Sequence, residues 1–501
     1  MSYKHGVYGA VADTYEATSV AQGTIPAYIG SAPIHRINTN GSSGFKYSDY
    51  VNKPILINSF REAKELGLYS ENWAAYTLGE VLHAHFMNGE SSAAPIILVN
   101  VLNPEADTAD SATTKTVTMK KVGTKFIGYI EDPLCLIDNI ALTIAETIAS
   151  KHTVTYYYDG DKVVIEAEVT LASGKENTTN FTAEATYTQI AFTADKFTAD
   201  VVDDALNCLD YCEQNIGLIP NIIAAPGISE IPTLHALMVQ KAIDKLAGKW
   251  NVVVLSDIPS DTVTTYEAAE TWKEENNYDS KLEKVFFPKL AYGDKVYHYA
   301  TVAAYMMQNI DTQNSDVPYV SISNKELFCD RAVVGTGDTL QTLQISEQKA
   351  NDLNKVGITT VNVIKRNLRV WGSHMGNYDH LNVGSIAPEN RFDASVRMSM
   401  YILNYLQNQY INEIDESFSR KDVDSIVNGI QTWLDSLVND NMLLYATVSF
   451  NNESNSDEAI ANGDFVFDLQ VTYSVIAKSI TFKLQYTSAG LVALTTDGGE
   501  A

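Results

Sequence analysis

Cysteine, positive charge and long apolar runs are all scarce in this sequence of 501 residues. Its four cysteines are too few and too scattered for a disulfide framework in a chain of this length. Lysine and arginine number 35 against 62 aspartates and glutamates, which gives a formal net charge of −27. Such a charge repels phosphate backbones and anionic lipid, so we expect neither direct nucleic-acid binding nor membrane insertion.

Targeting signals are equally sparse. The opening residues, MSYKHGVYG, contain no apolar core of a signal peptide, and no run approaches the roughly 20 apolar residues that span a bilayer. The longest candidate, residues 93–102, is interrupted by Pro95 and Asn100 and is typical of a buried strand. We therefore expect the protein to be made and folded in a cytoplasm.

Composition favours a folded protein with several cores. Hydrophobic residues make up 45% of the chain and charged residues 19%, a balance that can bury extensive apolar surface. At roughly 150 residues per domain, the length predicts about three structural units.

The pattern along the chain predicts an α/β (α+β) multidomain fold with extended arms at both ends. Helices and buried strands alternate in two distant segments, which together predict a discontinuous core, and two insertions interrupt it. The first insertion is rich in Thr and Val with period-two alternation, typical of a β-sandwich-like domain, and the second has a strand, helix, strand order. The predicted boundaries are an N-terminal arm at 1–23, core segments at 24–104 and 341–479, the β insertion at 105–198, the α/β insertion at 199–340, and a C-terminal strand and tail at 480–501.

Two long amphipathic helices are expected near the C-terminus. The first covers Asp393 to about Glu413. The second places apolar residues three and four positions apart, as one buried helix face requires: Val423, Ile426, Ile430, Leu434 and Leu437. These helices precede an alternating strand that begins at Phe465.

The usual signatures of catalysis are missing. Residues 335–338 (GTGD) lack the third glycine of a dinucleotide loop and the Lys-Ser/Thr pair of a P-loop, so a surface turn is predicted. His83 and His85 stand two apart on a predicted helix and would face different directions, which favours structural roles over a metal site. Cys208 and Cys212 share an apolar helix face and are interpreted as core thiols. No cofactor or metal is expected.

Asp257 is the most enzyme-like residue. It follows the predicted strand 251–255, and parallel α/β sheets bind ligands beyond the carboxyl ends of their strands. No base, nucleophile or metal set accompanies it nearby, so capping of the turn is the favoured interpretation. An α/β-type enzyme that uses Asp257 with residues from distant segments remains the alternative function.

Five short segments, in this order, carry a resemblance to a known family. They are HGVY at 5–8; NKPILI at 52–57 with the helix 60–67; TL at 77–78 with AHF at 84–86 and APIILVNVL at 94–102; PNIIAAPG at 220–227; and NKVGI at 354–358 continuing to VWG at 370–372. With the β-rich insertion in its expected place, the chain resembles the contractile tail sheath proteins of bacteriophages and phage-tail-like bacteriocins. It departs from the common pattern at 300–325, which lacks the usual glycines, and at 374–377.

The resemblance implies a structural role and not an enzymatic one. Sheath subunits polymerise helically around an inner tube and contract to drive the tube through a bacterial envelope. The partners implied are further copies of this chain, the inner tail tube protein, and baseplate and tail terminator proteins. The implied location is a virion tail or phage-tail-like particle assembled in the bacterial host cytoplasm. A non-contractile adhesion protein with a β-sandwich module is a further alternative.

The sequence pattern and the family resemblance lead to the same expectation for the two terminal arms. The alternation of Ile480, Phe482, Leu484 and Tyr486 with polar residues gives the C-terminal strand one apolar side that must find a buried surface. The N-terminal arm carries Val7, Tyr8 and Val11 among small residues and cannot bury itself. The family implies that both arms pair with strands of neighbouring subunits. The tube-facing surface is expected at four cations around the first long helix, namely Arg391, Arg397, Arg420 and Lys421.

Overall fold

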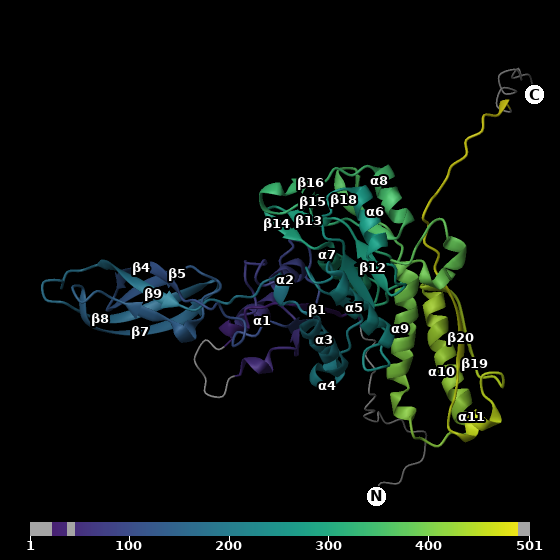
Figure 1. Cartoon of the computed structure of the whole chain (residues 1–501). Coiled ribbons are helices and arrows are strands. Elements are labelled where there is room, and N and C mark those ends of the chain that lie inside the picture. Colours follow the sequence, from purple (N-terminus) through teal and green to yellow (C-terminus); the bar gives the residue numbers. More distant parts are fainter. Residues whose placement is uncertain (1–22, 38–45, 489–501) are drawn as a thin grey trace, which may run out of the picture.

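The centre of the molecule is an eight-stranded sheet, seen in the computed structural model, which describes residues 23–37 and 46–488 (Figure 1). Six neighbouring strands are parallel, and the outermost strand on each side is antiparallel to its neighbour. The order is β18 (Asn367–Trp371), β17 (Ile358–Ile364), β12 (Glu283–Phe286), β11 (Val253–Asp257), β10 (Ile222–Ala224), β1 (Pro26–Gly30), β3 (Ile96–Asn100) and β2 (Pro54–Ile57).

This sheet corrects the predicted division of the chain. β10, β11 and β12 come from 199–340 and lie between strands of the N-terminal and C-terminal core segments. Residues 199–340 are therefore the middle of the core sheet and not a separate α/β insertion. Periodicity correctly predicted the strand, helix, strand order that ends with β11, and β10 and β11 are parallel, but β12 was not predicted. It carries no information about which distant strand lies beside them.

Helices cover both faces of the sheet, since every residue of its central strands is buried. One group consists of α2 (Leu78–Phe86) and α7 (Tyr299–Gln313), which both contact β1. The other group consists of α3 (Ala199–Cys208), which contacts β1, and α5 (Pro232–Asp244), which contacts β11. The remaining helices are α1 (Phe60–Glu65), α4 (Cys212–Ile216), α6 (Tyr266–Glu275) and α8 (Glu347–Lys355). A small antiparallel sheet lies in the same region: β14 (Lys295–Tyr297), β13 (Lys289–Tyr292), β15 (Arg331–Val334) and β16 (Gln341–Thr342).

Local signals set most helix ends. The Ser59 hydroxyl accepts a hydrogen bond from the Glu62 amide at the start of α1, and Gly67 has the positive φ of 70° that the following turn requires. α5 ends at Asp244. Lys245 leaves the helix with a φ of 65°, and the chain turns there to bring Leu246 beside Trp250.

The β-rich insertion forms a separate unit with its own apolar core, projecting from the main body (Figure 1). The insertion is one antiparallel sheet of six strands and not the two stacked sheets of the predicted sandwich. The first and last strands of this sheet both contribute side chains to the single core. The order is β6 (Ala141–Thr143), β9 (Asn180–Tyr187), β4 (Thr113–Val122), β5 (Lys125–Ile130), β8 (Lys162–Leu171) and β7 (Ala149–Asp159). Arg36 of the main body, which is 3% exposed, forms an ion pair of 2.8 Å with Asp161 at the tip of the β7–β8 hairpin.

The last part of the chain forms a C-terminal unit, defined here as α9 (Asp393–Gln409), α10 (Arg420–Asn439), β19 (Leu443–Ser449), α11 (Asp457–Ala461) and β20 (Asp468–Tyr473). β19 and β20 pair as an antiparallel two-stranded sheet that packs on α10. All five apolar residues of the predicted face are buried, which confirms the second amphipathic helix: Val423, Ile426, Ile430, Leu434 and Leu437.

Leu434→Ala is expected to destabilise the C-terminal unit. Leu434 of α10 is fully buried in the apolar cluster that α9, α10 and β19 share. Its truncation leaves a cavity and lowers the free energy of unfolding by about 2–5 kcal/mol. The measurement is the free energy of unfolding by denaturant titration. Leu403→Ala on α9, where the leucine is 45% exposed, is the matched control and should change stability much less. Equal losses in the two variants would contradict the packing described.

Candidate inter-subunit surface

Asp257 lies at the carboxyl end of β11, where the enzyme alternative requires it, and its observed contacts are those of a helix cap. Its Oδ1 accepts a hydrogen bond of 2.9 Å from the Ala300 amide in the first turn of α7. Its Oδ2 is buried and has no hydrogen-bond partner within the described ranges. Burial raises the pKa of Asp257 to about 7, since the ionised carboxylate is poorly solvated there.

Other charged groups near Asp257 pair with one another. His298 donates from its backbone amide to Glu80 at 2.7 Å, and its ring Nδ1 lies 2.8 Å from the second Glu80 oxygen. Burial lowers the pKa of His298, but the negative charges of Glu80 and Glu230 outweigh it, and the pKa is raised to about 9. Lys289 forms an ion pair of 2.9 Å with Asp261. This cluster joins the loop after β11 to the start of α7, so its evident role is structural.

The remaining candidate motifs are structural as well. His83 lies 2.8 Å from the Tyr297 hydroxyl, and His85 lies 2.6 Å from that of Tyr28, so the two rings have different partners. Cys208 and Cys212 pack on the main core, and burial raises the pKa of each thiol to about 12. The GTGD segment forms a turn with positive φ at both glycines. No group of three or more His, Cys, Asp or Glu residues in the described ranges could hold a metal ion.

The four predicted tube-facing cations do not form one patch. Arg397 is 6% exposed and is paired with the buried Asp311, so it is not a surface charge. Arg391 is half-buried and donates to the backbone carbonyls of Val383 and Ile386. The sequence could not show this, because an arginine near a helix start looks the same whether its partner is solvent or a distant carboxylate.

The other two cations are exposed. Arg420 begins α10 and forms an ion pair of 3.0 Å with Asp424, and Lys421 follows it. α9 has 17 residues and is therefore about 25 Å long. Since Arg391 precedes α9 and Arg420 follows it, the two positions lie at opposite ends of this helix.

After a last contact of 3.2 Å between Lys478 and the Tyr378 hydroxyl, the C-terminal segment leaves the body of the molecule (Figure 1). In the described part of the chain, residues 474–487 belong to no helix or strand. The four apolar side chains of the predicted strand are all exposed: Ile480 by 73%, Phe482 by 92%, Leu484 by 101% and Tyr486 by 80%. A sequence with this alternation normally has one buried side, so this surface lacks its packing partner within the described chain.

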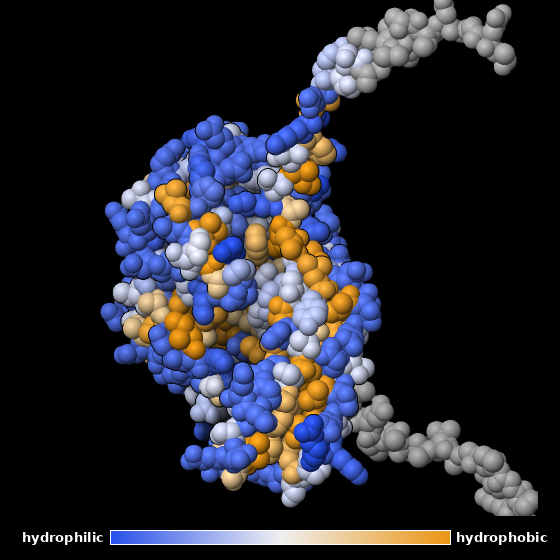
Figure 2. All heavy atoms as spheres, turned by 90° about the vertical axis from the view of Figure 1, so that its right-hand side faces the viewer, coloured by the Kyte–Doolittle hydropathy of each residue, from blue (hydrophilic) through white to orange (hydrophobic). Residues whose placement is uncertain are grey.

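An apolar band runs along the face of the molecule that carries the C-terminal unit (Figure 2). Exposed Leu444 and Tyr445 of β19 and Val466 before β20 contribute to the apolar surface of this unit. On the side that packs against α10, Leu469 and Val471 of β20 are only half-buried. This exposed surface and the bare C-terminal segment are both unusually apolar for a monomer, which makes them candidates for contact with other chains.

The two outer edges of the β19–β20 sheet differ. The side chain of Gln431 on α10 accepts a hydrogen bond of 3.1 Å from the Val448 amide and donates one of 3.2 Å to the Ala446 carbonyl. These two groups therefore point away from β20, and Gln431 occupies the outer edge of β19. Helix periodicity did not predict that Gln431 bonds to the edge of β19, because the pattern identifies this residue only as an ordinary polar position.

The β20 edge is open. Since Ala446 and Val448 point away from β20, their partners Val471 and Leu469 must point their backbone groups away from β19. No third strand lies beside β20 in residues 23–37 and 46–488. An unpaired edge of this kind is a template for another strand. Val7, Tyr8 and Val11 of the predicted N-terminal arm lie outside the described residues.

Comparison with known proteins identifies the fold. No protein-family model matches the sequence, and no curated protein matches it. A chain of the anti-feeding prophage baseplate has a TM-score of 0.54 at 13% identity, covering 97% of this chain and 100% of its own length. A chain of the PVC sheath complex, an extracellular contractile injection system in the contracted state, has a TM-score of 0.54 at 12% identity, with 97% and 98% covered. The chain therefore shares a mixed α/β, multidomain fold with components of these assemblies over nearly its full length.

Asp257→Asn is expected to reduce the pH dependence of stability. The folded-state pKa of about 7, against an ordinary 3.8, means that the folded protein holds this proton more tightly than the unfolded chain. Protonation of Asp257 therefore stabilises the folded protein by about 4 kcal/mol at most. This contribution is complete near pH 4 and is lost as the pH rises through 7. Asparagine keeps the acceptor for the Ala300 amide and carries no charge, so the variant should gain stability relative to wild type across this range.

The measurement is urea unfolding at intervals from pH 4 to pH 8. The charge of His298 partly offsets the rise that burial causes in the pKa of Asp257, so the two proteins are compared below about pH 8, where His298, with its own pKa of about 9, is charged in both. Asp338→Asn, in the exposed turn, is the control. A constant difference between Asp257→Asn and wild type at every pH would show that the assigned burial effect is wrong.

Proposed function

We propose that this chain is the structural subunit of a contractile sheath, which polymerises helically around an inner tube and shortens to drive that tube through a bacterial envelope. The observation that carries the proposal is the full-length fold similarity to a chain of a sheath complex. The bare apolar C-terminal segment supports it independently, because a subunit of a polymer needs surfaces that only other copies cover. Contraction is then driven by better packing between subunits, and it does not require a nucleotide.

Neighbouring copies are the first partners of this surface. The C-terminal strand around Phe482 adds to the open β20 edge of another copy, where backbone hydrogen bonds give affinity and the alternate side chains give register. Gln431 directs this addition to β20, because it already occupies the β19 edge. The N-terminal arm, with Val7, Tyr8 and Val11, reaches a second neighbour in the same way. Linkage through main-chain strands tolerates rotation of whole subunits.

Further partners follow from the same role. They are the inner tail tube protein inside the sheath, and baseplate and tail terminator proteins at its two ends. The location is the tail of a virion or a phage-tail-like particle, assembled in the host cytoplasm. Arg420 and Lys421 at the exposed start of α10 remain candidates for contact with the tube. The β insertion projects from the body and closes its own core, which supports a place on the outside of the particle.

Val471→Pro tests the receiving edge. The Val471 amide points away from β19, so proline removes a donor that has no strand partner in residues 23–37 and 46–488 and blocks the strand that would use it. We expect a folded, soluble protein whose tubes, viewed by negative-stain electron microscopy, are at least ten-fold fewer than those of wild type. Val471→Thr keeps the amide and the β-branched shape, and it should assemble normally. Undiminished assembly by a folded Val471→Pro variant would rule out β20 as the receiving edge.

Removal of residues 480–501 tests the donating segment. Within the described chain this segment packs on nothing, so circular dichroism and the melting temperature should remain those of wild type while tubes are lost. Four substitutions to serine, at Ile480, Phe482, Leu484 and Tyr486, keep the chain length and should give the same loss. Long contractile tubes formed by either folded variant would contradict the proposal.

A further inference from the structure

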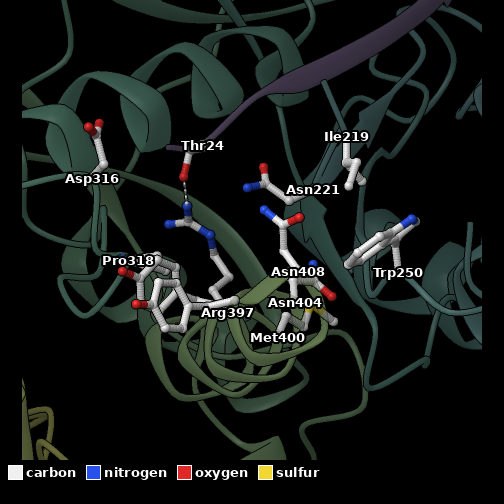
Figure 3. A pocket seen from close by; sticks show the side chains of 12 residues that line it. Thr24, Ile219, Asn221, Trp250, Asp316, Pro318, Arg397, Met400, Asn404 and Asn408 are labelled. Carbon is white, nitrogen blue, oxygen red and sulfur yellow. Dashed lines mark hydrogen bonds between the residues drawn. The ribbon is translucent and has the colours of Figure 1, made fainter. Parts of the chain in front are cut away.

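A pocket of about 60 Å³ separates α9 from the end of the core sheet where β1, β10 and β11 begin. α9 contributes one wall, including Arg397, Tyr405 and Asn408, and the core contributes Asn221 and Trp250 (Figure 3). The volume has room for one short side chain or about four water molecules. Since the pocket lies between the C-terminal unit and the core, whatever fills it also helps to join them.

The pocket holds the root of the N-terminal arm. Asn221 donates to the Gly23 carbonyl at 3.2 Å and accepts from the Ile25 amide at 3.0 Å, so it fixes the backbone on both sides of Thr24. Thr24 itself lines the pocket. A Cβ placed on Gly23 would lie 2.8 Å from Asp316 Oδ1, another lining group, so the backbone passes tightly along the rim.

Several lining groups have no bonding partner in residues 23–37 and 46–488. The Trp250 indole N–H is unpaired although its side chain is 97% buried. No hydrogen bond within these ranges involves the side-chain amide group of Asn408 or the side-chain hydroxyls of Tyr401 and Tyr405. Such a set offers both donors and acceptors without a net charge of its own, which suits peptide groups better than an ion. Met400 and Ile219 add apolar contact area for a small aliphatic side chain.

We propose that residues 18–22 of the same chain occupy this pocket, with the Val20 side chain in its apolar part and the flanking peptide groups on Asn408 and the tyrosines. Val20 is three residues from Gly23, so its Cα lies within roughly 11 Å of the Gly23 Cα whatever path the chain takes. It is also the apolar residue of suitable size nearest to the pocket along the sequence. The occupant is therefore tethered at the rim, and little chain entropy opposes its entry.

Docking of these residues would give α9 a further attachment to the core, in addition to those of Arg397 and Asn404. It would also leave residues 1–17 as the part of the arm that can reach a neighbour, about 17 Å shorter than a free arm of 22 residues. This last consequence rests on the proposed function, whereas the docking itself does not.

A cysteine pair tests the docking in unassembled protein. The double variant Val20→Cys with Asn408→Cys, oxidised at low protein concentration, should form an intramolecular disulfide in at least half of the molecules, identified by peptide mass spectrometry and by monomeric migration without reductant. Val20→Cys with Gln348→Cys is the matched control, because Gln348 is exposed on α8, far from the pocket, and should give less than a tenth of that yield. Wild type with its four native cysteines sets the background.

Equal yields in the two pairs, or a cross-link found only in dimers, would overturn the proposal. Hydrogen exchange of the unmodified protein gives a second readout that needs no substitution. The amides of residues 19–22 should exchange at least ten-fold more slowly than those of residues 2–10, and equally fast exchange would also overturn the docking. Because both measurements use unassembled chains, a failure here is distinguishable from a failure to form tubes.

Discussion

The buried contact between Arg397, Asp311 and Thr24 holds together the three parts of the chain that must be joined. Thr24 precedes β1, Asp311 lies in α7, and Arg397 lies in α9. The Thr24 hydroxyl donates to Asp311 at 2.5 Å, and Arg397 donates to Thr24 at 3.0 Å and to the same Asp311 oxygen. A charge buried this deeply is tolerated only with its partner, so the N-terminal strand, the central helix and the C-terminal unit are fixed relative to one another.

This contact lies in a buried centre, whereas the described C-terminal segment is exposed. The core sheet takes strands from three distant segments, and its central strands are buried on both faces by helices. A second polar contact, between Asn404 and the backbone of Asn251, joins α9 to the start of β11. By contrast, Phe482 and its apolar neighbours have no such contacts in the described chain. The proposed role as a polymer subunit requires both properties, since force must pass through a stiff body while the links between bodies stay adaptable.

Charge has different consequences at the surface and in the interior. The net charge of −27 keeps separate copies soluble, but it also means that copies repel one another unless specific contacts overcome the repulsion. The proposed backbone pairing at β20 and burial of apolar side chains do not depend on charge, and they suit an acidic chain for this reason. Within the interior, the acidic residues around α7 are balanced by His298 and Lys289 or are held protonated, as burial favours for Asp257.

The sequence by itself determined the elements and their chemistry. Period-two alternation predicted the strands of the β-rich insertion, and three-and-four spacing predicted the buried face of α10. These features depend on neighbours along the chain, so local pattern is sufficient. Tertiary structure alone decided that residues 199–340 form the middle of the core sheet, that Arg397 is buried, and that Gln431 closes one edge of the β19–β20 sheet. Each of these depends on a partner many residues away, and the residue type is the same whether or not that partner is present.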